Sequence, residues 1–303
     1  MIEIRRILCP IDFSEHSRLA LDHAVAVARW YGATITVFNV VALVPAMAYA
    51  PGTPMLPMTV PTADDLHALL ASVKRFAESE TAAGVPMQFE LSEGDAATEI
   101  LERSASRASD LIVMGTHGRR GFDRLVLGSV TEKVIRKARC PVMTVPPGTA
   151  EAVPAPPLFK RVLCAIDFSD ASLHALDYAL SLAEEADAHL LLAHVVEVAP
   201  APQDTHSETS LESRSLDDYV AAAAQARAER LQRLVPDSVR TYSTVATTLA
   251  IGQAYREILR IASEQHSELI VLGAHGHSIA GLLFGSTAHH IVRQARCPVL
   301  TIR

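Results

Sequence analysis

Apolar runs of strand length alternate with segments of helical periodicity along the chain. The run from Arg6 to Asp12 is mostly apolar and ends on a carboxylate. Helical spacing follows it from Ser14, a natural N-cap, to Gly32, a natural helix stop. Residues 34–41 are dense in β-branched side chains, which favours a second strand. The pattern therefore predicts strands and helices in alternation.

The first half of the chain continues this alternation around one proline-rich interruption. Residues 42–62 contain five prolines, which exclude a continuous helix or central strand. A loop of this length is either a lid over a site or an insertion. The remaining elements predicted here are helix 63–83 before Gly84, strand 87–91, helix 95–107, strand 110–114, a helix opening at Gly128 and strand 140–145.

The second half of the chain repeats the first. Arg161 to Asp167 restates the opening strand, and Phe168-Ser169 restates Phe13-Ser14. The elements predicted for this half are strand 160–167, strand 189–196, a polar loop 199–210, helix 216–234, strand 239–245, helix 252–263, strand 268–272 and strand 297–302. Two domains, residues 1–147 and 158–303, are expected on either side of a proline-rich linker, residues 148–157.

Each half thus reads as an α/β domain with five parallel strands and helices on both faces of the sheet. In such open sheets a ligand lies beyond the carboxyl ends of the strands, where the winding direction reverses. Asp12 and Gly115 both follow strands. Their loops meet only if the first and fourth strands are neighbours.

Composition and charge narrow the class of protein. The 303 residues carry a net charge of −7, and no basic run suits a protein that neutralises nucleic-acid phosphates. No stretch approaches the roughly twenty apolar residues of a membrane span, and the N-terminus lacks the pattern of a secretory signal. We expect a cytoplasmic protein with no nucleic-acid or membrane partner. Cys9 matches Cys164 and Cys140 matches Cys297, each among apolar neighbours, which favours buried thiols over disulfides or a metal site.

Glycines mark the end of the fourth strand in each half. Gly115-x-x-Gly118 is followed by nine residues and Gly128-Ser129, whereas Gly276 is followed by eight residues and Gly285-Ser286. Neither the P-loop spacing nor the Rossmann spacing occurs in the chain. A loop and a helix start with small residues can aim backbone amides at one point, which suits a phosphate.

This glycine spacing, the strand ending in Asp12 and the closing Cys-Pro-Val strand of each half resemble the ATP-binding branch of the universal stress protein family. The resemblance implies tandem flavodoxin-like, Rossmann-like domains with strand order 3-2-1-4-5 and ATP between strands one and four. It also implies ATP as the cofactor and allows Mg²⁺ with it. The residues that it implies as nucleotide contacts are Pro10, Ile11, Asp12, Val40, Gly115, His117, Gly118, Arg119, Gly128, Ser129, Val130 and Thr131 in the first half, and Asp167, Gly273, Gly276, Gly285 and Ser286 in the second.

Several of these residues have a purely structural alternative. Asp12 and Asp167 could cap the following helices, and the glycines could serve tight turns or packing. His117 and His275 could act as bases or bond the local backbone. Because the second half lacks one loop residue and has His277 in place of Arg119, we predict that the first half binds ATP more tightly.

The function implied by the resemblance is a nucleotide-dependent stress-response module with an unknown protein partner. No nucleophile stands beside an evident base, so at most slow ATP hydrolysis or autophosphorylation is expected. The alternative is an interaction scaffold of the same fold without nucleotide. The last strands of the two halves, Val142–Val145 and Val299–Ile302, could pair as an intrachain pseudo-dimer, and a homodimer of whole chains is a further expectation.

Overall fold

The computed structural model describes residues 2–41, 62–78, 82–117, 127–147, 159–197, 225–235, 244–275 and 284–303. Contacts divide the chain into two compact units, residues 3–158 and residues 159–303 together with residues 1–2. These units are called the first and second halves below. Residues 42–61 of the first predicted loop, the predicted loop 199–210, the linker and most of the loop after Gly115 lie outside the described residues.

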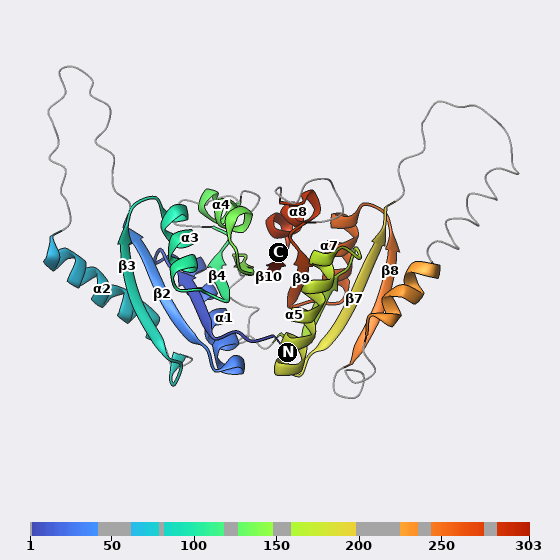
Figure 1. Ribbon diagram of the computed structural model, residues 1–303, viewed down its shortest axis with the longest axis horizontal. Helices are drawn as coiled ribbons and strands as arrows, with labels where there is room; N and C mark the ends of the chain where they lie inside the picture. The colour runs from blue at the N-terminus through green and yellow to red at the C-terminus, as the bar shows by residue number, and fades with distance from the viewer. Residues whose placement is uncertain are drawn as a thin grey trace, which may run out of the picture. The chain divides into compact units, whose positions relative to one another are not determined.

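The first half is a parallel five-stranded sheet with the order β3-β2-β1-β4-β5, as predicted (Figure 1). The order of winding reverses between β1 and β4: β2 and β3 are added on one side of β1, and β4 and β5 are added on the other, while all five strands stay parallel. Its elements are β1 Arg6–Pro10, α1 Glu15–Tyr31, β2 Thr34–Val41, α2 Ala63–Ala77, β3 Met87–Glu93, α3 Ala96–Ser106, β4 Leu111–Gly115, α4 Ser129–Lys137 and β5 Val142–Val145.

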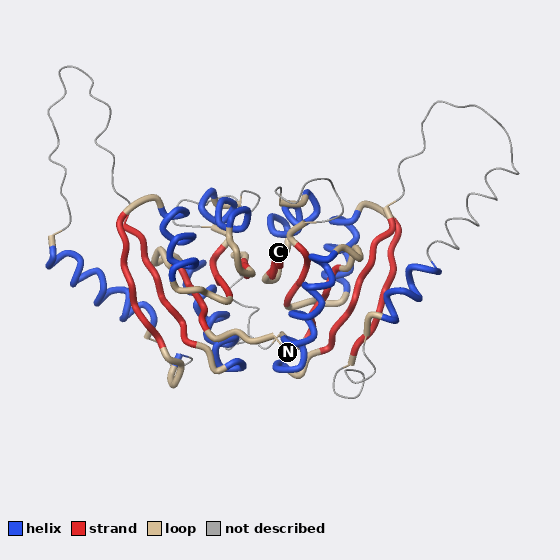
Figure 2. The backbone as a smooth tube through the Cα atoms, viewed as in Figure 1, coloured by secondary structure: helices blue, strands red, loops and turns tan. Residues whose placement is uncertain are grey.

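The second half repeats this sheet with the order β8-β7-β6-β9-β10. Figure 2 shows its helices and strands by colour. Residues 225–233 are helical and precede β8. The other elements are β6 Arg161–Ala165, α5 Asp170–Ala186, β7 His189–Val196, β8 Val245–Ile251, α7 Ala254–Glu264, β9 Leu269–Gly273, α8 Ser286–Gln294 and β10 Val299–Ile302.

Helices cover both faces of each sheet. Right-handed crossovers place the helices that lead from β1 to β3 on one face of the sheet. The helices that lead back across the sheet to β4 and β5 then lie on the opposite face. In the first half α1 contacts α2, and α3 contacts α4, which matches this rule. The central strands are buried from both sides, as shown by Leu8, Ile35 and Ile112, all with no exposed surface.

Local signals position the helices where the sequence predicts them. The Ser17 amide donates to Ser14 Oγ (3.2 Å), so Ser14 caps α1. Gly32 ends the same helix in the left-handed conformation, at φ 65°. Ser169 caps α5 in the same way in the second half. These caps orient the two helices that begin beside Asp12 and Asp167.

Two predicted boundaries are wrong. Helix α2 ends at Ala77, not at residue 83, because Glu78 has extended backbone angles and Gly84 (φ 81°) belongs to the turn before β3. The third strand of the second half is Val245–Ile251 and so continues past the predicted end at residue 245, because β7 pairs with it from Leu190↔Val245 to Val196↔Ile251; residues 239–243 of the predicted strand lie outside the described residues. Pairing with a neighbour outweighs the weak strand propensity of its alanines.

Candidate functional site

The carboxyl ends of the first and fourth strands meet in each half. Strand β1 pairs with β4 through Ile7↔Leu111 and Leu8↔Ile112, and β6 pairs with β9 through Ala165↔Leu272. The prediction that these strands are neighbours is therefore confirmed. The loops after them, which carry most of the predicted contacts, open at the same edge of the sheet.

A cavity of about 530 Å³ lies at this edge in the second half. Its size falls within the roughly 300–1,000 Å³ usual for small-molecule sites. It brings together all the predicted second-half contacts that the structure describes, while Gly276 lies outside the described residues. The predicted contacts that line it are Asp167, Gly273, Gly285 and Ser286.

Other residues that line the cavity occupy positions equivalent, in the repeat, to predicted contacts of the first half. Ala165, Ile166 and Val195 line it where the repeat matches Pro10, Ile11 and Val40. The remaining lining residues that match predicted contacts are His275, Thr287 and Ala288, at the positions of His117, Val130 and Thr131. In the first half Gly118 and Arg119 lie outside the described residues.

The helix that opens onto the cavity has no side-chain cap. Gly285 precedes α8 and makes no side-chain cap hydrogen bond, and its own amide donates to the Ala274 carbonyl (2.8 Å). Gly128 does the same before α4 in the first half, with its amide on the Thr116 carbonyl (2.8 Å). By contrast, Ser169 satisfies the first turn of α5. Free amides and the positive end of the helix dipole suit an anion.

Two arginines add positive charge at the cavity. Arg227 and Arg230 line it from the helix at residues 225–233. The Arg230 guanidinium lies over the Phe168 ring, 4.1 Å from its centroid. In the first half Arg18 lies over Phe76 (4.2 Å), and Phe76 packs edge-on against Phe13, the counterpart of Phe168. Sequence reasoning missed these arginines, although the arginine-rich composition of helix 216–234 was a usable signal.

The two predicted aspartates hold the turn into the first helix. Asp12 Oδ1 accepts hydrogen bonds from the Ser14 amide (3.1 Å) and the Ser14 hydroxyl (2.5 Å). Asp167 Oδ1 accepts the same pair from Ser169 (2.9 and 2.5 Å). They therefore support the capping serine, a structural role, while Asp167 also lines the cavity.

The strand-end glycines allow a helix to approach. A Cβ on Gly273 would lie 2.9 Å from backbone atoms of Ala171 and Ser172 at the start of α5. On Gly115 it would lie 3.1 Å from His16 Cβ. At these two positions the close contacts therefore support the alternative that the glycines serve packing. A Cβ on Gly128 would meet the Thr116 carbonyl oxygen at 3.0 Å, next to the uncapped helix.

Histidines gather at the first-half site. His117 is buried and its Nδ1 lies 2.9 Å from Thr116 Oγ1. The rings of His117 and His16 make an edge contact at 5.8 Å between centroids. Burial lowers the pKa of His16, and His117 lowers it further, while Asp12 and Glu15 oppose the shift. The Thr131 hydroxyl, at the start of α4, donates to the Gly115 carbonyl (2.9 Å), which ties helix to strand.

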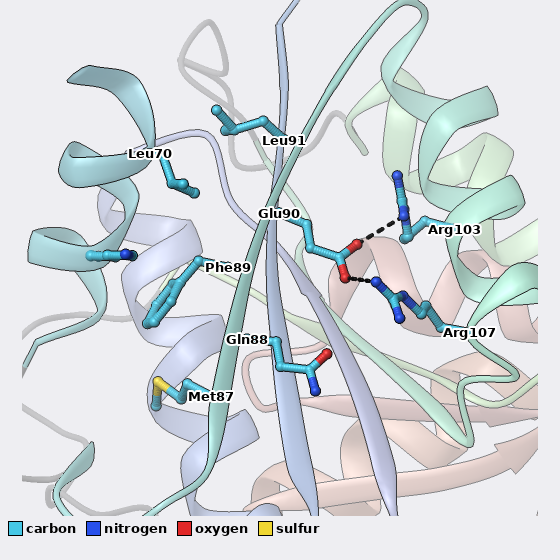
Figure 3. A pocket seen from close by; sticks show the side chains of 9 residues that line it. Leu70, Met87, Gln88, Phe89, Glu90, Leu91, Arg103 and Arg107 are labelled. Atoms are coloured by element: carbon cyan, nitrogen blue, oxygen red, sulfur yellow. Dashed lines mark hydrogen bonds and ion pairs between the residues drawn. The ribbon is translucent and has the colours of Figure 1, made fainter. Parts of the chain in front are cut away.

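A second pocket, of about 580 Å³, flanks strand β3 and contains none of the predicted contacts. Figure 3 shows Phe89 and Met87 on one side of the strand and Glu90 on the other. Glu90 pairs with Arg103 (2.9 Å) and with Arg107. Among the described residues, the only carboxylate that lines this pocket is therefore already paired with two arginines.

The described residues contain neither a membrane-spanning helix nor a group of metal ligands. No helix among them is both long and apolar enough to span a membrane. Within the same ranges no group of three or more His, Cys, Asp or Glu side chains is arranged to hold a metal ion. Cys9 and Cys164 are fully buried in β1 and β6, as predicted, and burial raises the pKa of both thiols.

Known proteins with similar sequences and structures give one consistent identification. A protein of Methanocaldococcus jannaschii named as a universal stress protein is 35% identical over 141 residues, 46% of this chain and 81% of its own length. One from Mycolicibacterium smegmatis is 27% identical over 98% of this chain and 96% of its own length. The crystal structure of a universal stress protein from Archaeoglobus fulgidus shares the fold, with a TM-score of 0.66 and 23% identity over 99% of this chain and 97% of that one.

A family model described as the universal stress protein family matches residues 3–146 and again residues 158–303. The two matches cover both halves and nearly the whole chain. The repeated sheet, its strand order and the sequence matches agree. The chain therefore belongs to the universal stress protein family and carries two copies of its domain in tandem.

Proposed function

We propose that the chain binds ATP at the carboxyl ends of β1 and β4 and of β6 and β9, and acts as a nucleotide-dependent stress-response module. The observation that supports this most directly is the cavity of the second half. It gathers Asp167, Gly273, Gly285 and Ser286, which the resemblance to the universal stress protein family implies as nucleotide contacts.

The chemistry of the cavity fits a nucleoside triphosphate. The uncapped first turn of α8 offers backbone amides, and Arg227 and Arg230 offer positive charge for phosphate oxygens. Apolar side chains such as Ile166 and Ile258 also line the cavity, which suits a base. ATP would be held by these groups, with the anionic end at α8.

The first half is proposed to bind a second ATP. Helix α4 has no side-chain cap hydrogen bond from Gly128, as α8 has none from Gly285. The ranking in which the first half binds more tightly stays a prediction. Bound nucleotide would order the loops beside it and so change a surface presented to a protein partner. Cytoplasmic location, self-association and pairing of the two halves belong to this proposal as well.

The test is a binding titration of the full chain with a labelled ATP analogue. Two equivalents are expected to bind to the wild-type chain, and one to each of the variants Gly128→Asp and Gly285→Asp. Aspartate is a favourable N-cap, so these variants should fold while their carboxylates take the amides needed by phosphate. Gly128→Ala and Gly285→Ala are the matched controls, since they add the Cβ without the charge.

The competing function is an interaction scaffold of the same fold that binds no nucleotide. Absence of saturable ATP binding to the wild-type chain, or full binding by the double aspartate variant, would reject the proposed sites. Equal affinity losses in the two single variants would show the predicted ranking wrong. ATP turnover clearly above background, lost on changing Asp12 or His117, would move the function toward an enzyme.

A further inference from the structure

His194 is buried at the second-half cavity and one of its ring nitrogens has no partner in the described part of the chain. The residue lies on β7, is 6% exposed and lines the cavity. Its Nδ1 lies 2.7 Å from the Ile166 carbonyl oxygen. A carbonyl only accepts, so Nδ1 carries the proton and Nε2 presents a lone pair. That buried Nε2 has no hydrogen-bond partner among the described residues.

A buried acceptor without a partner is unfavourable by roughly 1–3 kcal/mol, which calls for an explanation. The ring cannot turn to satisfy Nε2 without giving up the Ile166 bond. Phe168 packs against the imidazole, with 4.7 Å between centroids, and fixes its plane. Because His194 lines the cavity, a bound molecule can supply the missing donor.

The first half has an equivalent arrangement built from a different residue. Asn39 lies on β2 at the position that matches His194, and it is buried. Its Nδ2 donates to the Ile11 carbonyl oxygen (2.8 Å), the counterpart of Ile166. The amide oxygen of Asn39 is then an acceptor, as His194 Nε2 is. Both halves therefore fix an acceptor by bonding the same main-chain carbonyl.

We infer that His194 Nε2 is a recognition group that accepts a hydrogen bond from an N–H or O–H of the nucleoside bound in the second half. The inference rests on the proposed nucleotide binding and adds a residue and a ligand chemistry to it. The adenine amino group and the ribose hydroxyls are the two donors that a nucleoside such as adenosine offers. A nucleotide without the relevant donor would leave Nε2 unpaired and bind more weakly.

The same group makes binding in the second half sensitive to pH. Protonation of Nε2 would turn the acceptor into a donor and abolish its bond to the ligand. Burial lowers the pKa of His194, the Ile166 bond opposes that shift, and nearby charges contribute smaller effects of both signs. The neutral form therefore dominates at pH 7. The charged and titratable groups that line the cavity with it are Asp167, Glu197, Arg227, Arg230 and His275.

Ligand analogues test the donor. We would titrate the full chain carrying Gly128→Asp, so that the second half is measured alone, with ATP, N6,N6-dimethyl-ATP, 2′-deoxy-ATP and 3′-deoxy-ATP. Loss of the one donor that meets His194 should weaken binding by roughly 5- to 150-fold, the range expected for an unpaired buried acceptor. The analogue that loses affinity identifies the base or the ribose as the source. Equal affinity for all four would overturn the inference.

Variants at position 194 distinguish a role of His194 in ligand recognition from a role in packing alone. His194→Asn should retain the carbonyl bond and an acceptor, as Asn39 does, and so retain binding without the pH dependence. His194→Phe should lose the discrimination between ATP and the weak analogue. For the wild-type residue, affinity should fall on acidification by at most about tenfold per pH unit, the limit for one proton.

The His194 imidazole can also be observed directly by NMR, a test that does not depend on measured ATP affinities. The His194 ring signal, assigned in the NMR spectrum of the full chain by its absence in His194→Asn, should shift on ATP addition and its pKa should fall further. Binding of ATP with an unmoved His194 signal would overturn the inference and leave the proposed function intact. Absence of ATP binding altogether would instead reject the proposed function.

Discussion

Acidification should destabilise the first half through one buried histidine on α1. His23 is 3% exposed, and its Nδ1 donates to the Leu19 carbonyl oxygen at 2.7 Å. Burial lowers its pKa to about 4, although the Leu19 bond opposes the shift. The unfolded chain has no such burial, so its histidine keeps a pKa near 6.5.

The sign and size follow from proton linkage. Between pH 6.5 and pH 4 the unfolded state binds a proton at His23 that the folded state does not, so stability falls as pH falls. Above about pH 6.5 both states are neutral and the residue contributes no pH dependence. The loss in the free energy of unfolding should reach about 2 kcal/mol at pH 5 and about 3 kcal/mol at pH 4.

The chain offers a clean probe for this measurement. Its single tryptophan, Trp30, lies on the same helix, so its fluorescence reports unfolding of the first half. Urea denaturation would be followed from pH 7.5 to pH 4 for the wild-type chain and for His23→Gln. Glutamine can still donate to the Leu19 carbonyl but does not titrate.

The difference between the two unfolding free energies isolates His23, since the other groups contribute to both proteins. It should be constant above pH 6.5 and shift toward the variant by about 3 kcal/mol at pH 4. A difference that stays flat down to pH 4 would refute the depressed pKa, and so would a shift in favour of the wild type.

Two further predictions concern the frame of the site. Gly273→Ala should lower the free energy of unfolding by about 1–3 kcal/mol, because the new Cβ would press on the backbone of Ala171 and Ser172 at 2.9 Å. The matched change Gly115→Ala should have a smaller effect, because the nearest contact of its new Cβ would be at 3.1 Å. Equal losses of unfolding free energy for the two variants in urea denaturation would contradict the packing argument. Ser14→Ala should destabilise the first half by about 1 kcal/mol through loss of the α1 cap, measured by Trp30 fluorescence, and wild-type stability would show the cap to be dispensable.

Local signals account for the part of the fold that the sequence predicts well. Strands β2 and β7 have the predicted bounds, because β-branched and apolar residues fill them between clear stops. Ser14 and Gly32 bracket α1 because capping depends on a few adjacent residues. By contrast, β8 ends later than predicted, because its bounds follow from pairing with β7.

The candidate site divides in the same way. Its glycine and aspartate positions can be recognised in the sequence. Those that the structure describes in the second half line one cavity. The sequence does not show why residue 273 must be glycine, because the close approach of α5 exists only in the folded domain. By contrast, the hydrogen bonds of Asp167 to Ser169 are local, since an Asp carboxylate commonly accepts from the residue two positions on, and they fit the capping role that the sequence allows.

By itself, the amino-acid sequence determined the repeated alternation of strands and helices, since this depends on short-range periodicity and caps. The strand order was implied only by the resemblance to the family. Only the tertiary structure decided which distant side chains complete the cavity. His194 comes from β7 and Arg230 from the helix at residues 225–233, far along the chain from Gly273 and Gly285. They meet because parallel strands bring their carboxyl ends to one edge, and that proximity follows from packing of the whole domain.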